Sequence, residues 1–161
     1  MYKYIAKYLL LPKVFRFFRL VVLPSLFLGL VGFLICSYLA LFVLPADASQ
    51  QEIYRILFVH VPAAIFSELI YIFMACCGFI YLVWKTKISA IMLRSAISLG
   101  LVFTLIVLIS GAIWGKPTWG TYWVWDARIT STFILLIQYI GLLALRTSFN
   151  CLLYTSPSPR D

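Results

Sequence analysis

The sequence contains very little charge. Of its 161 residues only 11% are charged, whereas soluble domains average roughly 25%, and 64% are hydrophobic. Such a chain has too little polar surface to cover a core surrounded by water, so a soluble globular domain is excluded. The composition indicates an integral membrane protein that packs against a lipid bilayer.

Acidic residues are especially scarce, with 5 Asp and Glu against 13 Lys and Arg, for a net charge of +8. A positive excess can indicate a nucleic-acid partner. Here, however, the charges lie at the borders of apolar runs, and no nucleic-acid-binding motif is present. This distribution is the one that orients helices in a membrane. We therefore expect no nucleic-acid partner.

Residue patterns for covalent or hydrolytic chemistry are also missing. The four cysteines form neither a CxxC pair nor a CxxCH sequence, so we expect no disulfide framework and no covalent heme attachment. The chain has one His, no Gly-rich phosphate loop and no nucleophile paired with a base. We predict that the protein is not an enzyme, and that any ATP hydrolysis coupled to it occurs in a partner.

Four apolar runs are long enough to cross a hydrocarbon core of ~30 Å, namely 20–44, 56–84, 88–113 and 129–145. Pro62 predicts the start or a kink of the second helix, since proline cannot donate to the helical hydrogen-bond ladder. The predicted fold class is all-α, a polytopic bundle of transmembrane helices with four spans. The transmembrane domain is placed at residues 20–146.

Basic residues flank these runs unequally. Because successive runs cross the membrane in opposite directions, their ends fall on two sides. Counted through Arg146, nine basic residues lie on one side and three lie on the other: Arg55, Lys116 and Arg128. The more basic side of a multi-pass protein is the inner side. We predict that both termini lie inside, that residues 1–19 form a basic inner segment, and that residues 114–128 lie outside.

Residues 114–128, WGKPTWGTYWVWDAR, hold four of the five tryptophans. We call them the tryptophan segment. Their Gly and Pro residues argue against a continuous transmembrane helix, so we expect a loop or a short helix at the membrane–water boundary. The rings form either an ordinary interfacial belt or a platform for a flat apolar ligand.

The backbone geometry decides which of these rings share a face. A helix places four side chains on one face: Trp119, Tyr122, Trp123 and Asp126. An extended strand places three together: Trp119, Trp123 and Trp125. The rings cluster in either case.

Two blocks carry a family resemblance: WGKPTWGTYWVWDARITS, and YRILFVHVPAAIFS at residues 54–67. The first resembles the WWD motif of heme-handling membrane proteins in cytochrome c biogenesis. Together the blocks are similar to the heme exporter protein C family over about residues 19–145. The resemblance implies transient, non-covalent binding of heme b, and heme delivery or export on the outer face of the membrane.

The resemblance also implies partners and a location. The partners are a heme chaperone and the ATPase and membrane subunits of an ABC transporter. The location is the bacterial inner membrane or, alternatively, the mitochondrial inner membrane.

His60, the single His, is by the resemblance an axial ligand of the heme iron. The residue alone also allows a histidine that is simply hydrogen-bonded at the interface, because a polar group at this depth must be paired or face a cavity. The resemblance places the cofactor-binding set at His60 and seven further residues: Trp114, Trp119, Tyr122, Trp123, Trp125, Asp126 and Arg128.

The charged members of this set have simpler alternatives. Asp126 is well placed as the N-cap of the fourth helix. Arg55, Lys116 and Arg128 can bind heme propionates or pair with nearby acids. Arg128 is the preferred propionate partner because it lies within the motif.

Glu68 lies about two helical turns, ~12 Å, from His60 in the second run and points some 80° away from it. It therefore need not share the heme site, and we interpret it as a protonated side chain facing the bundle interior. Two alternative functions remain open. One is a small structural subunit of a membrane complex, and the other is a transporter or channel subunit that uses Glu68.

Residues 147–161 have a different composition, with Ser, Thr, Pro157 and Pro159, and predict a disordered tail unrelated to the family. The resemblance implies six spans and a second axial His after the tryptophan segment. The chain supplies no such His. We therefore expect a C-terminally truncated chain that ligates heme iron weakly, from one side only.

Overall fold

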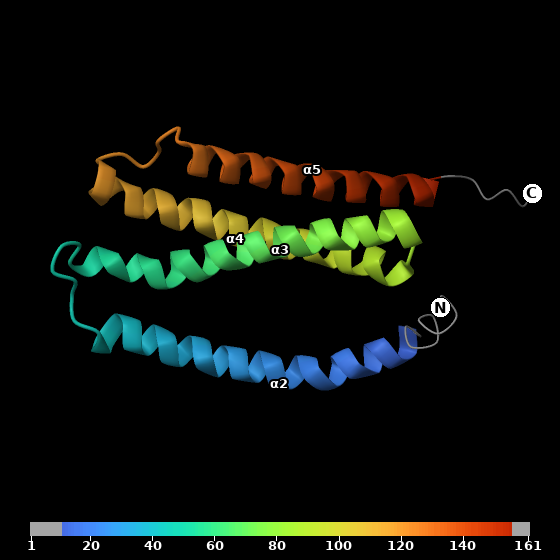
Figure 1. The fold of residues 1–161 in the computed structure, drawn as a ribbon, viewed down its shortest axis with the longest axis horizontal. Coiled ribbons are helices and arrows are strands. Elements are labelled where there is room, and N and C mark those ends of the chain that lie inside the picture. Colours follow the sequence, from blue (N-terminus) through green and yellow to red (C-terminus); the bar gives the residue numbers. More distant parts are fainter. Residues whose placement is uncertain (1–10, 156–161) are drawn as a thin grey trace, which may run out of the picture. The chain divides into compact units, whose positions relative to one another are not determined.

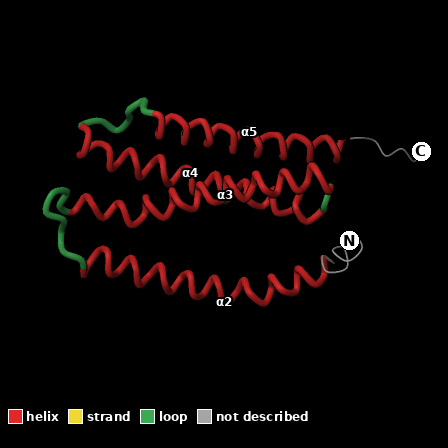
Figure 2. Tube along the Cα trace, viewed as in Figure 1, coloured by secondary structure: helices red, strands yellow, loops and turns green. Residues whose placement is uncertain are grey.

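The computed structural model describes the backbone of residues 11–155 and the side chains of residues 16–148. These residues form long helices joined by short connections (Figures 1 and 2). The elements in order are α2 (Leu11–Tyr38), the π-helical turn η1 (Leu39–Val43), the 3-10 helix η2 (Glu52–Ile56), α3 (Leu57–Trp84), α4 (Lys87–Trp119) and α5 (Ala127–Thr155).

Four helical stretches of the described chain are long and apolar enough to cross a membrane. The predicted all-α, multi-span fold class is confirmed. Large apolar side chains are exposed along these helices, as a lipid-facing surface requires.

The first compact unit extends to Phe58. At the end of its long helix, the Arg55 guanidinium donates to the backbone carbonyls of Ala40 and, at 3.0 Å, Leu44. Arg55 also pairs with Glu52. Arg55 thereby satisfies carbonyls that the end of a helix leaves without partners.

The second compact unit begins at Val59 and contains α3 from that residue on, together with α4 and α5. The last two helices run side by side in opposite directions (Figure 1). A small core is buried among the three helices: Met74, Ala96, Ile97 and Tyr139. Gly100 permits the close packing of α5 on α4, since a Cβ at this position would lie 2.3 Å from the Tyr139 ring.

Helix α3 is joined to α4 by polar and aromatic contacts. The Ser67 hydroxyl lies 3.0 Å from the Thr104 hydroxyl, and both side chains are buried. One residue away on each helix, the rings of Phe66 and Phe103 pack at 5.3 Å. These contacts fix the register of the two helices.

Two helices extend further than the sequence predicts. Helix α4 continues through Pro117 to Trp119, so residues 114–119 of the tryptophan segment are helical. Helix α5 passes the predicted end at Leu145 and reaches Thr155. The disordered tail predicted from residue 147 is therefore wrong for residues 147–155, which contain no Gly or Pro to stop the helix. Residues 1–10 of the predicted basic segment and residues 156–161 of the predicted tail lie outside the described residues.

Candidate functional site

The tryptophan segment changes conformation at Gly120, which has a φ of +78° and donates its N–H to the Lys116 carbonyl at 3.0 Å. Glycine adopts this left-handed conformation readily and commonly ends helices in this way. Residues 121–126 are irregular, and α5 begins at Ala127. Neither predicted geometry therefore applies to the whole segment, which is helical up to Trp119 and irregular after Gly120.

Asp126 closes the irregular stretch. Its carboxylate accepts the backbone N–H of Ile129 at 2.8 Å. This bond satisfies one of the free N–H groups at the start of α5, and the predicted N-cap role is confirmed. The cap anchors the end of the tryptophan segment to a rigid helix.

One cavity of about 240 Å³ lies among α3, α4, the tryptophan segment and the start of α5. Seven of the eight predicted site residues line it: His60, Trp114, Trp119, Tyr122, Trp123, Asp126 and Arg128. The first comes from α3, and the others come from a segment more than 50 residues later. The fold thus brings the two sequence blocks together.

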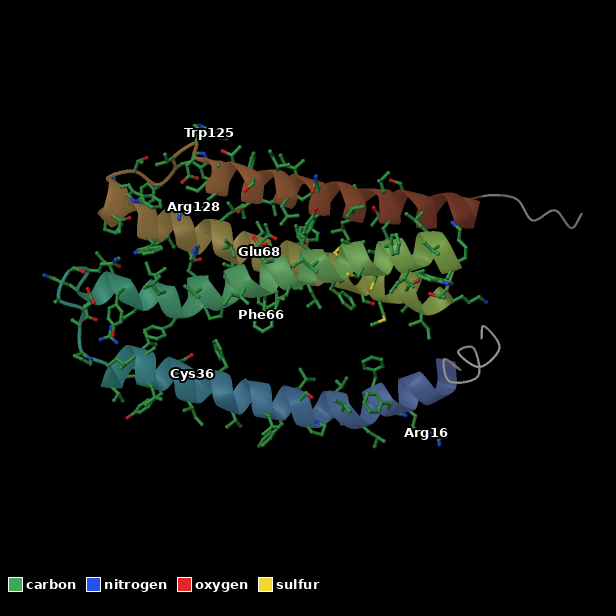
Figure 3. All side chains as sticks on the ribbon, viewed as in Figure 1. Arg16, Cys36, Phe66, Glu68, Trp125 and Arg128 are labelled. Atoms are coloured by element: carbon green, nitrogen blue, oxygen red, sulfur yellow. The ribbon has the colours of Figure 1, made fainter. Side chains whose placement is uncertain are left out.

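Trp125 is the predicted residue that does not line the cavity. Its side chain is 73% exposed, and Figure 3 shows it at the outer edge of the connecting loop. The ring packs edge-on against Trp123 at 5.4 Å and lies 6.4 Å from Phe133. Trp125 therefore packs against a residue that lines the cavity, Trp123, without lining the cavity itself.

His60 is the fourth residue of α3 and is half-buried. Its Nδ1 lies 2.9 Å from the Ser110 hydroxyl oxygen on α4. Its ring lies 5.9 Å from that of Trp114, and Gly111 leaves room for it, since a Cβ there would lie 3.1 Å from the His60 Cε1. The imidazole is thus held against one face of α4 while it lines the cavity.

The aromatic rings divide into an anchored part and a rim. Trp123 packs edge-on against Phe133 at 5.6 Å, and within the described chain its buried indole N–H has no hydrogen-bond partner. Trp119 and Tyr122 are 50% and 60% exposed. The rim rings are therefore accessible to a ligand, and Trp123 is held in place by its neighbours.

The three predicted outer cations have different surroundings. Arg55 binds carbonyls of η1 and its C-cap and pairs with Glu52, as described above. Lys116 donates to the Gly120 carbonyl at 3.0 Å and lies 5.3 Å above the Tyr122 ring. Arg128 lines the cavity, is 82% exposed and makes one long contact of 3.5 Å with Asp126. Arg128 is thus the cation best placed to receive an anionic ligand.

Glu68 also lines this cavity, on the side away from the tryptophan segment. The angular separation of Glu68 from His60 on α3 had left open whether the two residues share a site. The cavity extends over two turns of α3, however, because small side chains between the two residues and on α4 leave space: Ala64, Gly111 and Ala112. A pattern of small residues facing each other is the signal by which the sequence could have revealed this extension.

Comparison with known proteins identifies a family and several relatives that match most of the chain. The family model of heme exporter protein C matches residues 5–152, beyond both ends of the predicted resemblance. The heme exporter protein C of Escherichia coli (strain K12) is 50% identical over 106 residues, which are 66% of this chain and 43% of the relative.

Two further relatives come from other sources. The heme exporter protein C of Paracoccus denitrificans (strain Pd 1222) is 40% identical over 124 residues, covering 77% of this chain and 52% of the relative. A putative cytochrome c biosynthesis ccmC-like mitochondrial protein of Marchantia polymorpha is 49% identical over 106 residues, covering 66% and 46%. The chain spans about half the length of the curated relatives it matches.

Proposed function

Because the chain belongs to the heme exporter protein C family, we propose that its cavity binds heme and delivers it for the maturation of c-type cytochromes. One observation carries this proposal. A histidine, several indole rings and an arginine converge on a single cavity from two distant parts of the sequence. This combination matches an iron porphyrin, which has a metal centre, a flat apolar ring and two carboxylates. The role is transport and assembly rather than catalysis.

Each group of side chains suits one part of the ligand. A neutral imidazole such as that of His60 is a common axial ligand of heme iron. The rings of Trp114, Trp119 and Trp123 offer flat apolar surfaces for the porphyrin. The guanidinium of Arg128 can bind a propionate through charge-assisted hydrogen bonds.

The size of the cavity suits a protein that releases its ligand. Its volume of about 240 Å³ lies below the roughly 300–1,000 Å³ of sites that enclose a small molecule. Heme bound here would be held by one edge or face, and the remainder would stay accessible to a second protein. We propose that this second protein is a heme chaperone on the outer side of the membrane.

The wider setting follows the same proposal. The four spans would lie in a bacterial or mitochondrial inner membrane, with the tryptophan segment outside. The chain would work beside the ATPase and membrane subunits of an ABC transporter and carry heme b without a covalent bond.

Heme titration of the purified chain in lipid nanodiscs tests the proposal. We expect a Soret band that saturates near one heme per chain, and a loss of affinity of at least tenfold in His60→Ala because the iron loses its protein ligand. The proposal would be contradicted if the parent chain bound no heme, or if His60→Ala bound heme as tightly as the parent chain. Transfer of the bound heme to an added chaperone tests the delivery step.

Glu68 supports a second candidate function. A carboxyl group that lines a cavity within a transmembrane span is typical of proton or cation pathways. Ion flux through proteoliposomes that Glu68→Gln abolishes, with heme affinity unchanged, would favour a transporter subunit. Flux that is absent from the parent chain would remove this candidate.

A further inference from the structure

A histidine binds iron through only one nitrogen at a time. Neutral imidazole carries its proton on either Nδ1 or Nε2, and only the other nitrogen has a lone pair for a metal. The hydrogen bond made by the proton-bearing nitrogen therefore decides which atom can bind. In this chain the ring nitrogen of His60 that makes such a hydrogen bond is Nδ1, and its partner is the Ser110 hydroxyl.

The single hydroxyl proton of Ser110 settles that contact. Its oxygen lies 2.5 Å from the backbone carbonyl of Ile106 and 2.9 Å from the Nδ1 of His60. A carbonyl has no proton, so an oxygen–oxygen distance this short requires the hydroxyl to donate to Ile106. The hydroxyl can then only accept from His60, and the proton between them belongs to Nδ1.

The surroundings reinforce this assignment. The backbone carbonyl of Val107 lies 3.3 Å from the Ser110 hydroxyl. It is a second hydrogen-bond acceptor beside the imidazole, and it also favours a proton on the ring nitrogen that faces α4. Ser110 is 9% exposed, so water cannot easily replace it. Gly111 and Trp114 border the ring on the same helix. Tautomer and ring orientation are thus set by one short stretch of α4.

We propose that Ser110 is the positioning residue of the heme site: it holds His60 as the Nδ1–H tautomer and so presents Nε2 as the iron-binding atom. This inference rests on the proposed heme function. Hydrogen bonds of this kind typically change metal affinity by roughly 10–100-fold when they are removed.

The chain contains a matched control for this contact. Two turns away along the same α3–α4 interface, the Thr104 hydroxyl donates to the Gly100 carbonyl at 2.7 Å and accepts from Ser67 at 3.0 Å. The arrangement is the same, but a serine takes the place of the histidine. Ser67→Ala therefore removes an equivalent interhelical bond without touching His60.

The tautomer can be measured directly, without heme. Because His60 is the only histidine, labelling with ¹⁵N-histidine gives the NMR signals of one imidazole. In nanodiscs we expect a predominantly Nδ1–H ring in the parent chain, in Ser67→Ala and in Ser110→Thr. In Ser110→Ala we expect the Nε2–H form to increase. A parent ring that is mainly Nε2–H, or a tautomer ratio that Ser110→Ala leaves unchanged, would overturn the proposal.

Heme binding then tests the consequence for iron. We expect Ser110→Ala to weaken heme binding by roughly 10–100-fold and to lower the iron–histidine stretching frequency of the ferrous complex. We expect Ser110→Thr to restore both, and Ser67→Ala to change neither. Equal losses in Ser110→Ala and Ser67→Ala would reduce the contact to helix packing and contradict a positioning role.

The two measurements separate the two claims. If the parent ring is Nδ1–H and Ser110→Ala changes the tautomer ratio, but the parent chain binds no heme, only the proposed function is refuted. Tight heme binding by a parent chain with an Nε2–H ring would refute the role of Ser110 alone.

Discussion

At one end of the α3–α5 unit, α4 and α5 are joined by residues 120–126, whereas at the other end only Lys85 and Thr86 join α3 to α4. The long connection carries indole rings and borders the cavity with His60. The short one is a tight turn in which Lys85 has a φ of +52°. Basic side chains gather around this turn, and Arg146 donates to the Arg94 carbonyl at 3.1 Å.

This difference indicates how a bundle of apolar helices can form a candidate ligand site. The two ends are built on the same helices, so the helices alone do not provide it. The candidate site takes most of its lining from α3, α4 and the start of α5, and the irregular connection adds Tyr122, Trp123 and Asp126. The short turn borders a cavity of about 320 Å³, but its lining is basic and contains no Trp: Tyr81, Lys85, Lys87, Ala90, Ile91 and Arg94.

The largest expected difference between the ends is their exposure to opposite sides of the membrane. In a cysteine-free background, we expect a Cys at Thr118 to react fully with an impermeant maleimide added from outside. We expect a Cys at Thr86 to react only after the membrane is permeabilised, because the basic residues around this turn predict that it lies inside. The opposite pattern would invert the orientation and move the cavity to the inner face.

Removing one ring at each end tests whether heme binding belongs to the long connection. Trp123→Ala should weaken heme retention by about 1 kcal/mol or more, because a cavity-lining ring is lost. Trp84→Ala, beside the short turn, removes a ring of the same size that packs against Phe79 at 6.3 Å. We expect it to leave the heme dissociation rate unchanged. Similar losses in both variants would indicate general destabilisation.

The N-termini of α5 and α4, which lie at opposite ends of the unit, provide a third comparison. Asp126→Ala should lower the free energy of unfolding by about 1 kcal/mol, since the N-cap bond to Ile129 is lost. Asp126→Asn should cost less, because Asn also caps helices. Thr86 stands at the corresponding position before α4 but makes no side-chain capping bond. Thermal unfolding should therefore show a smaller loss of stability in Thr86→Ala than in Asp126→Ala. An equal loss of stability would mean that the capping bond does not account for the effect of Asp126→Ala.

The smallest effect is expected within the tryptophan segment itself. Trp125 is mostly exposed and does not line the cavity, so Trp125→Ala should reduce heme affinity less than Trp123→Ala. Heme titration of the two variants, with Trp125→Phe as the matched control for an aromatic ring, measures the difference. A greater loss in Trp125→Ala would mean that this ring turns toward the ligand.

Much of this arrangement could be predicted from local sequence. The apolar runs revealed the four spans, and two motifs identified seven residues that line one cavity. The cap by Asp126 was also predictable, because its partner lies three residues away on the same helix. In each case a pattern within one short stretch is enough.

The remaining features depend on three-dimensional packing. Ser110 meets His60 only because α3 and α4 adopt one particular register, which no single stretch of sequence encodes. Glu68 reaches the cavity because small residues on neighbouring turns widen it. Trp125 turns away from the cavity because its ring packs on Trp123 and Phe133, although an extended backbone would have placed it beside Trp123 on one face.

Arg55 binds carbonyls only 11 and 15 residues before it. A contact this local costs little loop-closure entropy, so it can form early during synthesis. Ser110, by contrast, is translated 50 residues after His60. At ~5–20 residues per second, roughly 3–10 s of translation separate the two. We therefore expect the connection between the first two spans to be settled while His60 still lacks its partner, so that newly made protein becomes competent for heme only once α4 has been inserted.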